Sequence, residues 1–168
     1  MLVDRSVGIY GPQAGVNPLP SKATTRVAGS ASEAVFDGGG TLGVLIRILA
    51  DDVVIDGIEV RNGTGDLIES TTGVPTANTR IRNCIVHDAI GDEAIQLRAV
   101  ANGIIECNHV YSTFGDGINL CCTSVDGLIR YNEVHDIDSE NAAIYIYSST
   151  NTVVEGNLVY GTSTNEGI

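Results

Sequence analysis

The chain has 168 residues, a net charge of −12 and a single lysine, which excludes nucleic acid and anionic membrane surfaces as natural partners. No stretch approaches the roughly 20 apolar residues of a membrane span, so we expect none. Apolar residues make up 43 %, with many valines and isoleucines and 20 glycines, and this composition favours one packed domain built from strands.

The N-terminal part, residues 1–41, predicts one irregular coil. The segments VGIYG (7–11) and AVFDGG (34–39) are expected strands, and residues 12–33, which contain three of the four prolines, form a long loop between them. A third strand is expected at Val44, because Val44 lies 11 residues before Ile55. Residues 42–168 are regular, and we expect 1–168 to form a single domain whose C-terminal end has no cap.

The regular part repeats about every 25 residues. The octapeptides IRNCIVHD (81–88) and IRYNEVHD (129–136) are nearly identical and lie two repeats apart. Each repeat has three short segments of β-branched residues separated by Gly, Asn, Asp and Ser, which predicts three strands. Their central residues are Ile55, Ile81, Ile105, Ile129 and Val154 in the first segment, Val60, Val86, Val110, Val134 and Val159 in the second, and Ile68, Ile95, Ile118, Ile144 and Ile168 in the third.

This pattern predicts an all-β fold, a single-stranded right-handed parallel β-helix of about six coils. In the register that it implies, Asn108, Asn132 and Asn157 stack at the turn after the first strand, where they can form an asparagine ladder. One outward column alternates in charge at every coil and should pair acid with base: Asp56, Arg82, Glu106, Arg130 and Glu155.

The repeats GLIRYNEVHDIDSENAAIYIYSS, GIIECNHVYSTFGDGINLCCT and TVVEGNLVYGTSTNEGI resemble the parallel β-helix repeat of the pectin-lyase-like superfamily. The resemblance covers about residues 42–168 and implies the fold. It also implies polysaccharide as the partner, because that superfamily includes polysaccharide lyases, glycoside hydrolases and uronate epimerases, although tailspikes and noncatalytic surface proteins share the fold. The chain lacks the paired aspartates of the polygalacturonases, the DPHE-type motif of the mannuronan epimerases and the basic set of the pectate lyases.

The outer face of the third strands carries side chains that suit a sugar chain. Two rows are expected there: Leu45, Glu69, Gln96, Asn119 and Tyr145, and beside them Arg47, Thr71, Arg98, Cys121 and Tyr147. Amides bond hydroxyls in both directions and tyrosine rings stack on sugar faces, so Glu69, Gln96, Arg98, Asn119, Tyr145 and Tyr147 are the candidate substrate-binding residues. The alternative is an ordinary polar solvent face.

Gly-Asp pairs precede three of the third strands. Asp66, Asp92 and Asp116 are therefore expected to stack at one edge of this face, with Glu93 and Glu140 nearby. Stacked carboxylates repel each other unless they share a cation, for which calcium is suited, or a proton, which would make Asp92 or Asp116 a general acid. The alternative is that Gly-Asp is simply favourable turn chemistry.

A second candidate for catalysis follows the second strands. The outward column there contains His87, Tyr111 and His135, and a histidine with a tyrosine could abstract the C5 proton of a uronate and protonate the leaving oxygen. Repetition alone also produces such columns without any function.

Two classes of function stay open. One is extracellular or cell-surface carbohydrate binding or processing, as an acidic-polysaccharide lyase or a hydrolase. The other is a structural solenoid that self-associates through its open ends or through the outward apolar column Val54, Ile104, Leu128 and Val153. Cys84, Cys107, Cys121 and Cys122 lack metal-type spacing, and the sequence does not determine whether they form disulfides.

Overall fold

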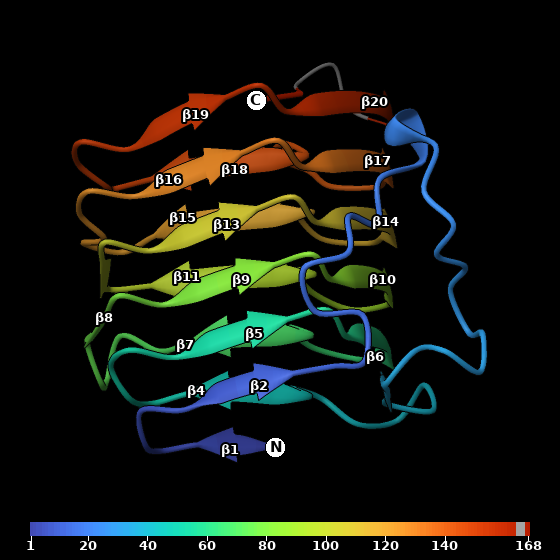
Figure 1. Cartoon of the computed structure of the whole chain (residues 1–168). Helices are drawn as coiled ribbons and strands as arrows, with labels where there is room; N and C mark the ends of the chain where they lie inside the picture. The colour runs from blue at the N-terminus through green and yellow to red at the C-terminus, as the bar shows by residue number, and fades with distance from the viewer. Residues whose placement is uncertain (164–166) are drawn as a thin grey trace.

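A computed structural model, which describes residues 1–163 and 167–168, shows a parallel β-solenoid with three long faces (Figure 1). Each face is a sheet of six parallel strands, so the chain makes about five turns between the first and last strand of a sheet, slightly fewer than the six coils expected. The predicted fold class is confirmed. We number the sheets 1, 2 and 3 in the order in which a coil visits them.

The three sheets differ in the lengths of their strands. Sheet 1 contains β2 (Gly8–Tyr10), β5 (Val54–Asp56), β9 (Arg80–Arg82), β13 (Ile104–Glu106), β16 (Leu128–Arg130) and β19 (Val153–Glu155). Sheet 2 contains β3 (Val35–Asp37), β6 (Glu59–Gly63), β10 (Ile85–Ala89), β14 (His109–Thr113), β17 (Glu133–Ile137) and β20 (Leu158–Thr162). Sheet 3 contains β1 (Leu2–Val3), β4 (Ile46–Ile48), β7 (Ile68–Ser70), β11 (Ile95–Arg98), β15 (Ile118–Cys121) and β18 (Ile144–Tyr147). The short strands β8 (Thr76–Ala77) and β12 (Val100–Ala101) pair at the turn between sheets 3 and 1.

The core follows directly from the repeat. The predicted isoleucine and valine columns face inward and stack coil on coil, so that residues such as Ile81, Val86 and Ile95 are fully buried. Burying each such side chain contributes roughly 1.5–3 kcal/mol. The column does not extend to Ile168, which lies outside the strands, although the carbonyl of Gly167 accepts a hydrogen bond from the Ile144 amide.

Three stacked asparagines hold the turn between sheets 1 and 2, and two of them, Asn108 and Asn132, are buried. The side-chain oxygen of Asn132 accepts hydrogen bonds from the Asn108 backbone amide at 2.9 Å and from the Asn108 side chain at 3.0 Å. The Nδ2 of Asn132 donates to the carbonyl of Ile105 and to Asn157 Oδ1, both at 2.9 Å. Each asparagine therefore satisfies backbone groups of the neighbouring coil that have no strand partner at the bend.

The outer side of sheet 1 carries the alternating charge column in the expected register. Arg82 pairs with Asp56 and Arg130 pairs with Glu106, each at 2.8 Å. These pairs are partly exposed and add little stability individually. They do specify register, because a slip of one residue would turn the charges into the core.

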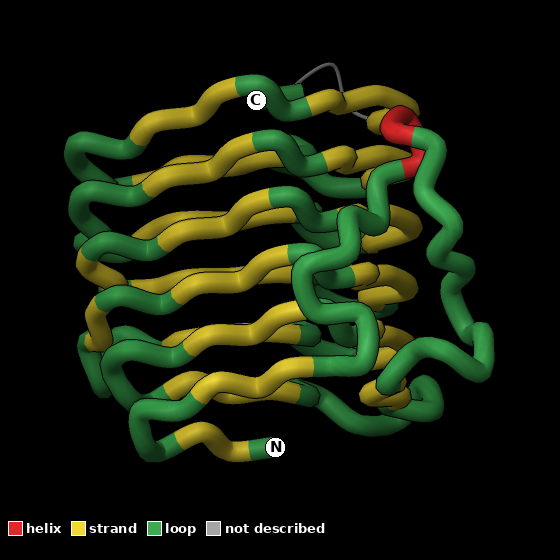
Figure 2. Tube along the Cα trace, viewed as in Figure 1, coloured by secondary structure: helices red, strands yellow, loops and turns green. Residues whose placement is uncertain are grey.

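The loop between β2 and β3 is a strap that crosses the solenoid parallel to its axis. It carries the 3-10 turn η1 (Pro20–Lys22) and runs beside the strands of sheet 2 (Figure 2). Its backbone amides at Ser21 and Gly29 donate to Glu133 and Glu59 at 2.9 and 2.6 Å. Within the strap, Arg26 forms an ion pair with Glu33 at 2.7 Å, and both side chains are buried.

We expect Arg26→Ala to detach the strap while leaving the coils folded. The substitution strands the buried Glu33 carboxylate without its partner, a change that typically costs roughly 3–5 kcal/mol. Amide hydrogen exchange over residues 12–33 should accelerate at least tenfold, while the circular dichroism of the solenoid stays the same. Arg5→Ala, which changes an exposed arginine, is the control. Unchanged exchange in the strap of Arg26→Ala would contradict this role.

Candidate functional site

The outer face of sheet 3 carries one continuous row of polar and aromatic side chains. Backbone pairing aligns Arg47, Glu69, Gln96, Asn119 and Tyr145. The prediction that Leu45 begins this row was wrong, because Ile46 rather than Val44 pairs with Ile68. Beside this row, Arg98, Cys121 and Tyr147 align as expected, whereas Thr71 lies just beyond β7.

Ion pairs hold the N-terminal half of the row. Glu69 is buried between Arg47 and Arg98, and Arg98 Nη1 donates to Glu69 Oε2 at 2.9 Å. The same Arg98 nitrogen lies 3.3 Å from Asp66 Oδ2. Arg98 therefore connects the predicted binding row to the acidic edge of the face.

The acidic edge contains a carboxyl cluster formed by Asp66, Asp92 and Glu93. One oxygen from each of the three lies within 4.8 Å of the others, and their side chains range from buried Asp66 through half-buried Glu93 to exposed Asp92. The Glu93 backbone amide donates to Asp66 Oδ1 at 3.3 Å. Glu93 Oε2 is buried and has no hydrogen-bond partner among the described residues.

Burial makes two of these carboxyls hold protons at unusually high pH. Burial raises the pKa of Asp66 to about 7, and raises the pKa of Glu93 to about 10 with further contributions from Asp92 and Asp66. A buried carboxylate oxygen without a donor is costly, which also favours the protonated form of Glu93. At pH 7 the cluster therefore contains a proton donor, Glu93, beside the exposed Asp92.

The cluster should make stability depend on pH. Because the native pKa values of Asp66 and Glu93 are raised, their contribution is complete below about pH 4 and is lost as pH rises through about 7 and then about 10. We expect the free energy of unfolding to fall between pH 5 and 9 more steeply in the wild type than in Glu93→Gln, by up to ~1.4 kcal/mol per pH unit for each proton. Urea unfolding at pH 5, 7 and 9 measures this, and parallel profiles would refute it.

Asp116 is not part of this cluster. It is buried, its Oδ2 accepts from Asn119 Nδ2 at 2.8 Å, and its Oδ1 accepts from the Ser139 hydroxyl. Glu93, not Asp92, occupies the position equivalent to Asp66 and Asp116, two residues before the paired isoleucines. The expected stack of three aspartates was therefore wrong at its middle coil, and the expected calcium ligands Asp66 and Asp92 are joined by Glu93 instead of Asp116.

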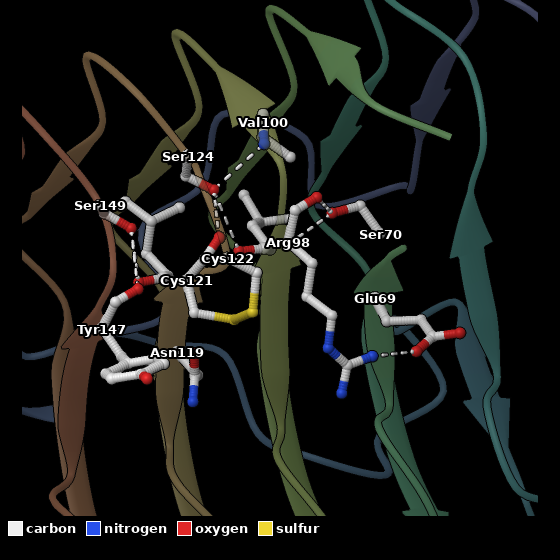
Figure 3. The surroundings of a disulfide bond; sticks show 12 residues. Glu69, Ser70, Arg98, Val100, Asn119, Cys121, Cys122, Ser124, Tyr147 and Ser149 are labelled. Atoms are coloured by element: carbon white, nitrogen blue, oxygen red, sulfur yellow. Dashed lines mark hydrogen bonds and ion pairs between the residues drawn. A yellow bond between two sulfur atoms is a disulfide. The ribbon is translucent and has the colours of Figure 1, made fainter. Parts of the chain in front are cut away.

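The C-terminal half of the row carries amide side chains and tyrosine rings, with a disulfide beside them. The side-chain oxygens of Gln96 and Asn119 are buried and have no hydrogen-bond partner in the described part of the chain. The rings of Tyr145 and Tyr147 lie parallel with centroids 6.2 Å apart, and Tyr147 is largely exposed. Cys121 forms a disulfide with its neighbour Cys122 in the middle of this region (Figure 3).

The second predicted catalytic column forms a ring stack on sheet 2. The ring of Tyr111 stacks between His87 at 4.7 Å and His135 at 5.3 Å. His109, which the sequence reasoning did not select, places its Nε2 2.8 Å from the Nε2 of His135. Burial lowers the pKa of His109 to about 4, and in the short contact one of the two nitrogens donates a hydrogen bond that the other accepts.

The strap limits access to this stack. His87 is buried and bonds Glu59, whose other oxygen accepts from the strap at Gly29. Glu133 is likewise shared between Tyr160 and Ser21 of the strap. The structure thus brings His87, Tyr111 and His135 together beside the strap, whereas the carboxyl cluster lies on the turns before β7 and β11, where Asp92 is exposed.

Residues 27–168 match the family described as a right-handed β-helix region. The chain belongs to the right-handed β-helix family. It has no significant match among curated proteins or solved structures. Membership fits the parallel solenoid and the resemblance to pectin-lyase-like proteins, and it supports carbohydrate-related or structural roles in general.

Proposed function

We propose that this right-handed β-helix protein binds and processes a carbohydrate chain on the outer face of sheet 3. The observation that carries the proposal is the carboxyl cluster, in which protonated Glu93 lies beside Asp92 at the edge of a row of amides and tyrosines. Perturbed carboxyls of this kind are typical of catalytic acids and bases. The sugar chain would lie across the strands, parallel to the solenoid axis.

The arrangement suits elimination from a uronate. Asp92 would take the proton from C5, and Glu93 would give its proton to the leaving O4, so that a C–H and a C–O bond break and a C4–C5 double bond forms. An acid and a base within 4.8 Å act on one side of the sugar ring, and this spacing is shorter than the roughly 6.5–9.5 Å of inverting hydrolases. Arg98 would attract the substrate carboxylate.

Calcium is the alternative occupant of the carboxyl cluster. Calcium binds six to eight oxygens, and the cluster offers three carboxyls, one of which has the unpartnered oxygen Glu93 Oε2. These residues fit the ion, and Asp66, Asp92 and Glu93 would hold it in place of the proton. Bound calcium would supply positive charge for an acidic sugar at the edge of the face.

A turnover screen tests the proposal. The protein is incubated with pectate, alginate, chondroitin and neutral glycans, with calcium and with a chelator. Ultraviolet absorbance then detects unsaturated uronides, and a reducing-end assay detects hydrolysis. We expect absorbance to rise on a uronate polymer. Reducing ends without unsaturation would make the protein a hydrolase, and silence on every substrate would remove catalysis from the proposal.

Location outside the cell is part of the proposal. The Cys121–Cys122 disulfide supports it, because disulfides persist mainly in oxidising compartments. Among residues 1–163 and 167–168, no helix is long and apolar enough to cross a membrane. Nucleic acid is not expected as a partner on the grounds of charge.

A structural solenoid is the second candidate, favoured by the outer side of sheet 1. Val54, Ile104, Leu128 and Val153 form one outward column that Arg80 interrupts, and Val153 is half exposed. Such a column suits side-by-side association. Sedimentation over a range of protein concentrations tests it: a monomer at every concentration would exclude this role.

A further inference from the structure

The disulfide lies at the one bulged turn between β11 and β18. Backbone pairing aligns Arg98, Cys121 and Tyr147, and it also aligns Ala101, Val125 and Thr150. Two residues lie between the aligned positions in the first and last of these coils, but three lie between Cys121 and Val125. The coil with the disulfide therefore holds one extra residue, as in a β-bulge, which commonly re-aims side chains near functional sites.

The bulge brings the disulfide to the ligand face, where Cys122 is half-buried and Cys121 is buried. Consecutive residues in a strand point to opposite sides, but Cys122 has a φ of 63° and the next residue, Thr123, has a φ of 73°. Figure 3 shows the resulting disulfide on the same side of β15 as the side chains of Arg98, Asn119 and Tyr147. A vicinal disulfide is thus part of the same surface as the candidate binding row.

Hydrogen bonds hold the bulge independently of the sulfur atoms. The amides of Cys122 and Thr123 donate to the carbonyls of Tyr147 and Ser148 at 3.1 and 2.9 Å. The Ser124 hydroxyl donates to the Cys121 carbonyl at 2.7 Å and accepts from the Val100 amide at 3.1 Å. The backbone is therefore expected to keep its path whether the two cysteines are joined or not.

We propose that the Cys121–Cys122 disulfide is an apolar platform for the non-polar side of a sugar ring, and that reduction abolishes this subsite. The inference rests on the proposed function. Joined to the buried Cys121, the half-buried Cys122 presents a fixed, polarisable surface without hydrogen-bond donors, and the exposed Tyr147 ring extends it. Arg98, whose side chain is partly exposed, supplies a donor for hydroxyls beside the platform.

Reduction changes this surface chemically. A small dithiol transfers two electrons and two protons. One of its thiolates attacks a sulfur of the pair and forms a mixed disulfide with the protein. Its second thiolate then attacks the reductant's own sulfur in that mixed disulfide and displaces the protein cysteine. The Cys121–Cys122 bond breaks, both residues become thiols, and the reductant becomes a disulfide. Two separate thiol groups, no longer held together by a bond, then replace the rigid platform.

Calorimetric binding measurements on oxidised and dithiothreitol-treated protein test the inference. The probes are oligogalacturonate, oligomannuronate and cello-oligosaccharides, with thiol alkylation and mass spectrometry to confirm reduction and circular dichroism to confirm folding. We expect at least tenfold weaker binding after reduction, and the same loss in the double variant Cys121→Ser/Cys122→Ser. Cys107→Ser, which alters a free half-buried thiol at the turn between sheets 1 and 2, should match the wild type in both states.

The outcomes separate the two proposals. Equal binding by oxidised and reduced protein would overturn the platform and leave the proposed function intact. Absence of binding in both the oxidised and the reduced protein would overturn the platform and the proposed function together. A disulfide that resists reduction until the protein unfolds would overturn the claim that reduction abolishes the subsite. A double variant that is folded and binds normally would overturn the platform.

Discussion

Asn132→Ala is expected to lower the free energy of unfolding by about 3 kcal/mol or more. The substitution removes the acceptor of the Asn108 amide and the donor to the Ile105 carbonyl, both at a buried turn. Each buried backbone group left without a partner costs about 1–3 kcal/mol. Urea unfolding followed by circular dichroism measures the change.

The control for this prediction is Asn151→Ala. Asn151 is exposed at another turn and makes a single side-chain bond, to Asp126 at 3.1 Å. Because Asn151 has a φ of 55°, where alanine is disfavoured, Asn151→Ala should cost about 1 kcal/mol, clearly less than Asn132→Ala. If both variants were equally stable, the stacked asparagines would not be what holds the turn between sheets 1 and 2.

Glu93→Gln is expected to reduce kcat/KM on the cleaved polysaccharide by at least about a hundredfold. A general acid typically contributes 10²–10⁴-fold, and the amide cannot donate the proton that the raised pKa of Glu93 retains at pH 7. Initial rates from ultraviolet absorbance measure the effect, and circular dichroism verifies the fold.

Glu140→Gln is the matched control, because Glu140 is an exposed carboxylate on the turn before β18. It should keep the wild-type rate. A Glu93→Gln variant that also keeps that rate would remove Glu93 from the chemistry. A variant that loses only its response to calcium would assign the cluster to the ion.

The solenoid could be predicted because the same pattern of apolar and charged positions recurs in successive coils and fixes their alignment. Ile81, Val86 and Ile95 occupy positions that are apolar in every coil, and the alternating charges agree with the same alignment. The predicted alignment was wrong where the apolar pattern is compatible with more than one register. In VLIRIL (44–49) the run of apolar residues fits two alternations, and the repeat spacing predicts Val44 at the position that Ile46 occupies in the structure.

The candidate site was predicted only in part, for two physical reasons. Gly91 lies four residues before Ile95, whereas Gly65 lies three before Ile68, so the longer turn moves Glu93 into the stack in place of Asp92. The packing of the strap on sheet 2 depends on contacts distant in sequence, such as Ser21 with Glu133, which no local pattern reveals. The charge on Glu93 likewise depends on burial.

The most direct test of the central claim is to map a bound oligosaccharide by amide chemical shifts in uniformly ¹⁵N-labelled, oxidised protein. The probe is the oligosaccharide of whichever polymer the turnover screen identifies, or oligogalacturonate if none is cleaved. We expect the shifts that change to cluster on β11, β15 and β18 and on the turn that carries Asp92 and Glu93. Changes confined to sheet 1, or to the strap and sheet 2, would contradict a ligand face on sheet 3.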